Sequence, residues 1–478
     1  MNAQIMKLFV VIVVLFALLI VFTTRWTVLD ANALNANPLN SRTLITKLEV
    51  RKGNVLADNG KVLARSVKQR STGFWLRSYP TGPLFAQAIG YNDLRKGSAA
   101  GLELYREAAL RGAQTGLTSV FGPLGGNQDV GNDLDTTLDP KAQEVARQQL
   151  AGRAGSVVAL DPRTGAVLAM YSNPSYDDNN PNPKTPCTDA CQLNRATQGQ
   201  YPPGSTFKIV TATAAIDSGR YTPNSVVNGN SPKTISGVPL QNDNNQSFGA
   251  ITLTKALTYS VNTVWAQVAE KVGRPTMTAY MKRFGFYSKP PIDLPPGELN
   301  TSRPYDFKGH AFPPGSPNED IGRIAIGQGG LLVTPLQMAM VAATVANHGT
   351  LMAPRLSVKT VDQDGRTVQT FPPTVYRRVM KPAVAAEINQ MMRTVVDEGT
   401  GQAAQLGSGI QFAGKTGTAS IGPTGAGETQ PWFIGFAPAN APKVAVAVTI
   451  EKTQGQFGGQ VAAPIAKAVV QTLLSEGK

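Results

Sequence analysis

Tyr201-Pro202-Pro203-Gly204-Ser205-Thr206-Phe207-Lys208 is the stretch of this chain from which both the fold and the chemistry can be worked out. The two prolines exclude a helix before Gly204, whereas Phe207 to Ile216 is almost wholly apolar and strongly helical. Ser205 is therefore predicted at the N-terminus of a buried helix. Lys208, three residues later, is expected one turn further along the same face.

This pair of side chains could form a nucleophile and its base. A serine hydroxyl attacks poorly until a neighbouring base accepts its proton. A lysine that is desolvated near the positive end of a helix dipole can have its pKa lowered enough to act as that base. The amides of the same helix N-terminus can stabilise an oxyanion. The alternative is a helix cap followed by a surface lysine, because Ser-x-x-Lys is expected by chance roughly once in a chain of this length.

Histidine offers no competing base in this sequence. The chain has only two, His310 and His348, and neither lies within a motif. A serine–histidine triad is therefore not indicated, and lysine is the predicted base.

A second polar pair lies in Ser260-Val261-Asn262, after the helical stretch 253–259. The motif places a hydroxyl and an amide on alternate positions of a short loop. The hydroxyl of Ser260 could relay a proton, and the amide of Asn262 could orient a substrate carbonyl. Ser-x-Asn is common, so the motif read alone is better explained as a polar turn.

A third element is Lys415-Thr416-Gly417-Thr418. It follows the β-like run 410–413, and Trp432 to Phe436 forms a second strand after a turn-rich segment, so a hairpin is predicted. Gly417 has no side chain, which would let a substrate backbone pair with the strand there. The ammonium of Lys415 and the two threonine hydroxyls suit a carboxylate. The alternative is an ordinary edge lysine that protects a strand.

The remaining pattern of the second half predicts an α+β domain that begins near residue 133. Strands are expected near both ends of this region and helices between them, so that the C-terminus completes the sheet. Helices are predicted at 140–150, 207–217, 253–271, 335–347 and 462–474, and strands at 157–160, 166–170 and 443–450.

The N-terminal part predicts a membrane anchor and a small extended module. Leu8 to Phe22 contains no polar side chain, and its flanks bring the apolar stretch to the length of a spanning helix. A cleaved signal peptide with a site at Ala31-Asn32-Ala33 is the alternative, although that site lies far beyond the apolar run. Residues 25–132 are expected to form a β-rich module, with a turn at Asp58-Asn59-Gly60 and a linker at 122–127.

The composition argues against nucleic acid as a partner and against a metal site. The net charge is +14, but lysines and arginines are scattered, so no nucleic-acid-binding stripe is predicted. The only cysteines, Cys187 and Cys191, are interpreted as a local disulfide, with free thiols as the alternative. A metal site would need more ligands than two sulfurs, so none is expected.

Taken together and in this order, the three motifs resemble those of a monofunctional class B penicillin-binding protein. They are 55 and 155 residues apart, which leaves room for a helical subdomain before the chain returns to the sheet. The resemblance covers nearly the whole chain, although Lys52 and Ala57 differ from the residues that are usual in the family's N-terminal motif. Further matching stretches are 159–170, Asn194-Arg195-Ala196, Gly327-Gln328-Gly329, Thr334 to Gln337, and 432–438.

The resemblance implies a penicillin-binding, serine β-lactamase-like fold with an antiparallel sheet, an all-helical subdomain and an N-terminal pedestal. It also implies peptidoglycan D,D-transpeptidation without a cofactor. Ser205 would attack the penultimate D-Ala carbonyl of a donor stem peptide, with neutral Lys208 as its base. Ser260 would pass a proton to the departing D-Ala, and Asn262 would hold the donor amide.

The remaining site roles follow from the same resemblance. Lys415, Thr416 and Thr418 would bind the terminal carboxylate on the strand that contains Gly417, and the amides of Ser205 and Thr418 would form the oxyanion hole. An amine of a neighbouring stem peptide would then resolve the acyl-enzyme, and β-lactams would acylate the same serine. The catalytic domain is expected outside the cytoplasm, with a membrane glycosyltransferase as a partner.

Other functions known for proteins with these motifs fit the sequence less well or differ only in the acceptor. A class A β-lactamase needs a deacylating glutamate before Leu299-Asn300, but that position holds Pro296, and Glu298 is displaced by two residues. A D,D-carboxypeptidase shares the motifs and uses water in place of the amine. About 108 residues between anchor and catalytic domain are too few for a glycosyltransferase domain. A sensor would need a cytoplasmic signalling portion, whereas scaffolding in a wall-building complex is compatible with catalysis.

Overall fold

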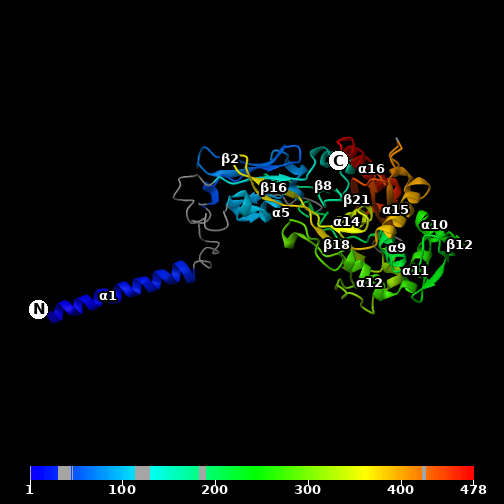
Figure 1. The fold of residues 1–478 in the computed structure, drawn as a ribbon, viewed down its shortest axis with the longest axis horizontal. Helices are drawn as coiled ribbons and strands as arrows, with labels where there is room; N and C mark the ends of the chain where they lie inside the picture. The colour runs from blue at the N-terminus through cyan, green and yellow to red at the C-terminus, as the bar shows by residue number, and fades with distance from the viewer. Residues whose placement is uncertain are drawn as a thin grey trace.

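The computed structural model describes residues 2–30, 45, 47–112, 130–181, 190–407, 409–421 and 427–478. Its long axis runs from an N-terminal helix, through a sheet that includes β2 and β16, to a larger body of helices and strands (Figure 1). The predicted linker at 122–127 and the possible cleavage site at Ala31 to Ala33 lie outside the described residues.

The first helix, α1 (Asn2–Thr24), continues as a π-helical turn η1 (Arg25–Leu29). From residue 3 to Leu29 its side chains are exposed, and the helix stands away from the rest of the chain (Figure 1). Within the described residues, Ala3–Leu29 is the helix that is long and apolar enough to cross a membrane. Because a signal sequence has the same properties, the anchor remains a prediction.

The N-terminal sheet has six strands in the order β17-β16-β6-β1-β2-β3. Its first hairpin turns at Gly60, whose φ of +81° is a left-handed conformation that glycine adopts without strain, so the predicted turn is confirmed. β6, β16 and β17 lie beyond residue 132, and β6 pairs with β1 across the predicted boundary, which therefore stays a proposal. The strands are β1 (Val55–Leu56), β2 (Val62–Lys68), β3 (Trp75–Ser78), β6 (Asp133–Thr136), β16 (Ser357–Val361) and β17 (Thr367–Thr370).

The central sheet is antiparallel, in the order β19-β20-β21-β7-β8, and β22 pairs with β20. Every residue of β21 is buried, and successive side chains enter opposite cores: Val446 packs with α8 and α16, whereas Ala447 packs with α14. The sheet is thus covered on both faces. Its elements are α8 (Pro140–Leu150), β7 (Gly155–Leu160), β8 (Val167–Asn173), α14 (Pro335–Ala346), β19 (Ala413–Ser420), β20 (Glu428–Ala437), β21 (Val444–Ile450), β22 (Thr453–Gln454) and α16 (Gly458–Ser475).

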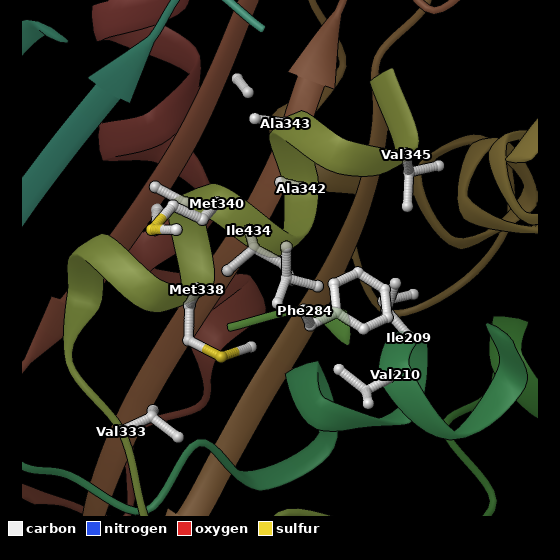
Figure 2. Packing of buried hydrophobic residues seen from close by; sticks show 14 of the residues in the cluster. Ile209, Val210, Phe284, Val333, Met338, Met340, Ala342, Ala343, Val345 and Ile434 are labelled. Atoms are coloured by element: carbon white, nitrogen blue, oxygen red, sulfur yellow. The ribbon is translucent and has the colours of Figure 1, made fainter. Parts of the chain in front are cut away.

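One hydrophobic cluster joins this sheet to the helical part of the molecule. Side chains of α14, Ile434 of β20, and Ile209 and Val210 of α9 (Lys208–Asp217) meet around Phe284 (Figure 2). All twelve residues of α14 are buried, and Thr334 caps its start by accepting a hydrogen bond from the Gln337 amide. The cluster holds α9 firmly against the sheet.

The helical part differs from the sequence prediction in one respect. The stretch 253–271 is not one helix, because α10 ends at Thr258 and α11 begins at Asn262. Ser260 lies in this break with a φ of +59°, a left-handed conformation that interrupts a helix. The helices here are α10 (Leu253–Thr258), α11 (Asn262–Val272), α12 (Arg274–Arg283), α13 (Ile321–Ile324) and α15 (Pro382–Asp397).

Short elements connect these layers. They are η2 (Gly82–Leu84), α4 (Ala86–Ile89), β4 (Asn92–Asp93), η3 (Leu94–Lys96), β5 (Ser98–Ala99), α5 (Gly101–Tyr105), α6 (Glu107–Leu110), η6 (Gly204–Phe207), β9 (Val226–Asn228), β10 (Lys233–Ile235), β11 (Val238–Leu240), η7 (Asp243–Asn245), β12 (Ala250–Thr252), η8 (Pro296–Glu298), β13 (Arg303–Pro304), β14 (Leu331–Leu332), β15 (Thr350–Met352), β18 (Val375–Arg378) and η9 (Gln402–Ala404).

Candidate active site

The half-buried side chain of Ser205 lies in the 3-10 turn η6, directly before α9. Backbone and side-chain hydrogen bonds hold this turn from two sides: the Gly204 amide donates to Gly327 O (3.0 Å), and Trp432 Nε1 donates to Pro202 O (2.9 Å). The predicted position of the serine at a helix start is therefore confirmed.

Lys208 is the first residue of α9 and has no exposed surface (0%). Its Nζ lies 2.8 Å from Ser205 Oγ, 2.6 Å from Ser260 O, 3.2 Å from Ser260 Oγ and 2.6 Å from Asn262 Oδ1. Burial, reinforced by the positive charge of Lys415, holds the pKa of Lys208 well below its ordinary value, and Asp243 opposes that shift. This shift favours the neutral amine, which is the form that a base for Ser205 needs.

Ser260 links the two lysines of the site. Its hydroxyl lies 3.2 Å from Lys208 Nζ and 3.0 Å from Lys415 Nζ. The left-handed backbone at Ser260 also turns its carbonyl oxygen toward Lys208. A hydroxyl between two amines can pass a proton from one side of the site to the other.

Lys415 projects from β19, which is the edge strand of the central sheet, and it is also fully buried (0%). Its Nζ lies 2.9 Å from the Thr416 carbonyl oxygen. Burial lowers the pKa of Lys415 to about 7, and the charge of Asp243 acts in the opposite direction. An anionic ligand at this position would restore the charge of Lys415.

The other residues of this strand face several neighbours. Thr416 Oγ1 lies 2.6 Å from Thr400 Oγ1, and Thr418 Oγ1 accepts a hydrogen bond from the Gly458 amide (3.1 Å). A Cβ on Gly417 would lie 2.7 Å from the Pro203 carbonyl oxygen. The absence of a side chain at Gly417 therefore lets β19 approach the nucleophile turn.

The predicted catalytic and substrate-binding residues thus converge, although they come from η6, α9, the α10–α11 break, the start of α11 and β19. Two participants were not anticipated as site residues. Thr400 and Asp243 have no motif around them in the sequence, and each reaches the site only through tertiary contacts. Gly327 lay in a stretch quoted for the resemblance, but its contact with Gly204 is visible only in the structure.

Glu298 does not belong to this constellation. Its carboxylate accepts hydrogen bonds from the Gly101 amide at 2.9 and 3.1 Å, which ties η8 to the start of α5. Burial raises the pKa of Glu298, and the Gly101 amide partly offsets this effect. The residue therefore joins the catalytic body to the N-terminal part, as expected for a loop residue that is displaced from the β-lactamase position.

The cysteine and metal predictions concern a different region. Cys187 lies outside the described residues, so the Cys187–Cys191 bridge remains a prediction, and Cys191 is buried beside Ala86 and Tyr176. Within the described ranges, no group of three or more His, Cys, Asp or Glu side chains could hold a metal ion. The chemistry described above uses only hydroxyl, amine and amide groups.

We predict that Gly327→Ala slows acylation of Ser205 by penicillin by about 10–100-fold, because small displacements of reacting groups are costly. A Cβ at residue 327 would lie 1.9 Å from Gly204 O, and the residue has a φ of +77°. Gly219→Ala is the matched control, with a φ of +74° and nothing within 4 Å of the new Cβ. Stopped-flow measurement of the acylation rate in both variants separates the steric clash at residue 327 from the strain of a positive φ, which both variants share. Equal rates in the two variants would contradict a steric role for Gly327.

Comparison with known proteins identifies the family. The model of the penicillin-binding protein transpeptidase domain matches residues 155–471, and that of the penicillin-binding protein A dimerisation domain matches residues 52–134. The chain belongs to the penicillin-binding protein transpeptidase family. This transpeptidase is 34% identical to the peptidoglycan D,D-transpeptidase PbpA of Mycolicibacterium smegmatis over 100% of both chains. The PbpA of Mycobacterium tuberculosis is also 34% identical, over 99% of both chains.

Solved structures agree with this assignment. The penicillin G acyl-enzyme complex of penicillin-binding protein A from M. tuberculosis matches with a TM-score of 0.77 at 31% identity, covering 89% of this chain and 99% of that chain. The D,D-transpeptidase domain of a peptidoglycan glycosyltransferase from Eggerthella lenta gives 0.76 at 31% identity, covering 90% and 99%. The predicted family, the fold class and the assignment to the serine-type transpeptidases are confirmed.

Proposed function

We propose that this transpeptidase cross-links peptidoglycan through an acyl-enzyme on Ser205, using stem peptides that end in D-Ala-D-Ala. The observation that carries the proposal is the 2.8 Å separation between Ser205 Oγ and the buried amine of Lys208. The substrate class is supported by the PbpA relatives, which are named as peptidoglycan D,D-transpeptidases.

In the first half-reaction, Lys208 takes the proton of Ser205 while Oγ attacks the carbonyl carbon of the penultimate D-Ala. The amides of Ser205 and Thr418 stabilise the negative charge on the carbonyl oxygen. The C–N bond then breaks, and the proton passes from Lys208 through Ser260 to the departing nitrogen. The products are free D-Ala and an ester on Ser205.

Two groups of residues position the donor for this attack. Lys415, Thr416 and Thr418 bind the terminal carboxylate on the open edge of β19, where Gly417 leaves the strand accessible to a peptide backbone. Asn262 holds the donor amide while its Oδ1 contacts Lys208. β-Lactams imitate this donor and acylate Ser205 in the same way, as supported by acyl-enzyme complexes of penicillin-binding protein A.

In the second half-reaction, an amine of a neighbouring stem peptide attacks the ester carbonyl. A C–N bond forms, the C–O bond to Ser205 breaks, and Oγ recovers a proton. We place this chemistry outside the cytoplasm, with the apolar helix α1 as a single-pass anchor and a membrane glycosyltransferase as the partner that supplies glycan strands. The exposure of α1 supports an anchor, because none of the residues in its most apolar window is buried in the protein.

The deciding experiment supplies the full-length protein in detergent or vesicles with lipid-linked wall precursor and a glycan polymerase. After muramidase digestion, mass spectrometry is expected to find dimeric muropeptides and free D-Ala. Release of D-Ala without dimers would establish a D,D-carboxypeptidase instead. Neither product, with the protein still binding the polymerase, would favour a scaffolding role.

We predict a bell-shaped pH dependence for acylation by penicillin. The rate rises with pH as Lys208, whose pKa is lowered by burial and by Lys415, loses its proton and becomes a base. It falls again around pH 7 and above as Lys415, with a pKa of about 7, loses the charge that binds the carboxylate. Because kcat/KM reports groups of the free enzyme, second-order rates should be measured from pH 5 to 10. A rate that keeps rising to pH 10 would contradict the role of Lys415.

A further inference from the structure

We propose that Asp243 binds the ammonium group of the acceptor stem peptide and presents it to the acylated Ser205. This inference rests on the proposed transpeptidase function and adds a subsite for the second substrate. Asp243 begins the short turn η7 in the loop 241–249 that connects β11 to β12. Its side chain is exposed at the side of the site that is formed by Asn262.

The position of Asp243 relative to the reacting groups follows from the contacts of Asn262. Asn262 Nδ2 lies 3.2 Å from the Gln241 carbonyl oxygen and 3.4 Å from Asp243 Oδ1. The other end of the same amide, Oδ1, lies 2.6 Å from Lys208 Nζ. One side chain therefore separates the carboxylate from the base. The long 3.4 Å contact leaves Asp243 free to take a stronger, charged partner.

The loop holds Asp243 in a defined place. Asn242, which precedes Asp243, is buried (4%). The side-chain Nδ2 of Asn242 donates hydrogen bonds to Gly229 O (3.0 Å) and to Gln246 O (2.8 Å). Asn242 also accepts a hydrogen bond from the Thr263 amide, in the first turn of α11 (3.0 Å). The two residues after Asp243 have left-handed backbones, with φ of +53° and +52°. The loop backbone at Asp243 is thus held against the helix that bears Asn262.

The charges around the site favour binding of an ammonium group at the Asp243 carboxylate. Lys208 and Lys415 are both fully buried, and the charge of Asp243 raises the pKa of each against the effect of burial. A primary amine with an ordinary pKa near 10.4 arrives as an ammonium ion at neutral pH, and protonated Lys415 would repel it. An exposed carboxylate beside them attracts that ammonium at little desolvation cost.

The same loop also supplies apolar surface. Phe248 stacks on Tyr259, with ring centroids 6.0 Å apart, and Tyr259 directly precedes Ser260. Tyr259 remains 42% exposed. An acceptor amine at the end of an aliphatic side chain could lay its methylenes on this pair while its ammonium reaches Asp243. These contacts favour a diamino-acid side chain as the acceptor.

The acyl transfer from this subsite balances in atoms and charge. The bound ammonium gives one proton to neutral Lys208, and the resulting amine nitrogen bonds to the ester carbonyl carbon. The C–O bond to Ser205 breaks, and a second proton from the nitrogen passes to Oγ. The amide product keeps the third hydrogen, Lys208 later releases its proton to solvent, and Asp243 remains a carboxylate throughout.

The test uses full-length Asp243→Asn in the precursor assay described above, together with labelling by fluorescent penicillin. We expect dimer formation to fall at least about 10-fold, because a charge-assisted contact to the acceptor is lost. Penicillin labelling should fall less than dimer formation, because Asp243 influences the donor side only through the pKa values of Lys208 and Lys415. Release of D-Ala during acylation of Ser205 should persist. Asp243→Glu should recover part of the cross-linking.

Asp364→Asn is the matched control, since Asp364 is an exposed acid (69% for its side chain) between β16 and β17. Unchanged cross-linking in Asp243→Asn would overturn the proposal. An equal loss of penicillin labelling and cross-linking would also overturn it, because Asp243 would then act through Asn262 and Lys208. Failure of the proposed function itself looks different: the wild-type protein would make no dimers.

Discussion

Ser205→Ala is expected to abolish covalent labelling by fluorescent penicillin and all formation of muropeptide dimers. The hydroxyl is the atom to which the acyl group is attached, so no neighbouring group can replace it. Loss of a serine nucleophile costs on the order of 10⁶ in kcat in a well-studied hydrolase, which is beyond the range of a gel assay. Intact-mass spectrometry should show the adduct on wild type and an unchanged mass for the variant.

The control for this experiment is Ser71→Ala, because Ser71 is exposed in the turn between β2 and β3. Ser205 is only half-buried, and the backbone hydrogen bond from Gly204 to Gly327 remains in the variant. The thermal unfolding midpoint should therefore stay close to that of wild type. An adduct that persists on folded Ser205→Ala would place the nucleophile elsewhere.

The local part of the site was predictable because it is encoded by neighbouring residues. Ser205 and Lys208 are three apart at a helix start, and the Pro202-Pro203 pair marks that start in the sequence. Around Ser260 the sequence supported two interpretations, of which the short loop after 253–259 was right and the continuous helix across 253–271 was wrong. What no local pattern could provide is the meeting of Lys208 with Ser260 and Lys415, because packing of α9, α11 and β19 sets those distances.

In the fold, too, single helices and strands were predictable from local sequence, whereas pairing between distant segments was not. The largely apolar run 443–450 predicted β21, and Asp139-Pro140 predicted the start of α8, where the Asp139 carboxylate accepts hydrogen bonds from two backbone amides. The six-stranded sheet was not predictable, because β16 joins β6 from more than 200 residues away. A helix predicted across 253–271 failed because its amphipathic pattern does not show that Ser260 takes a left-handed backbone.

Lys208→Met is expected to lower the rate of acylation by penicillin by about 10³-fold, within the 10²–10⁴ range of general base catalysis. Methionine has a similar length and no proton-accepting nitrogen. The variant keeps Ser205 in η6 and Lys415 beside Ser260, so reversible binding of the carboxylate should change little. The loss should therefore appear in the acylation rate constant and hardly in the dissociation constant.

Two further measurements make the assignment of the base specific. The rising limb of the pH profile should disappear in Lys208→Met, because Lys208 is the group whose deprotonation produces it. Lys61→Met, at an exposed position in the first hairpin, should leave both the rate and the profile unchanged. If Lys208→Met kept the wild-type rising limb, another group would accept the proton of Ser205. If instead only the dissociation constant rose, Lys208 would serve to bind the ligand and not to activate the nucleophile.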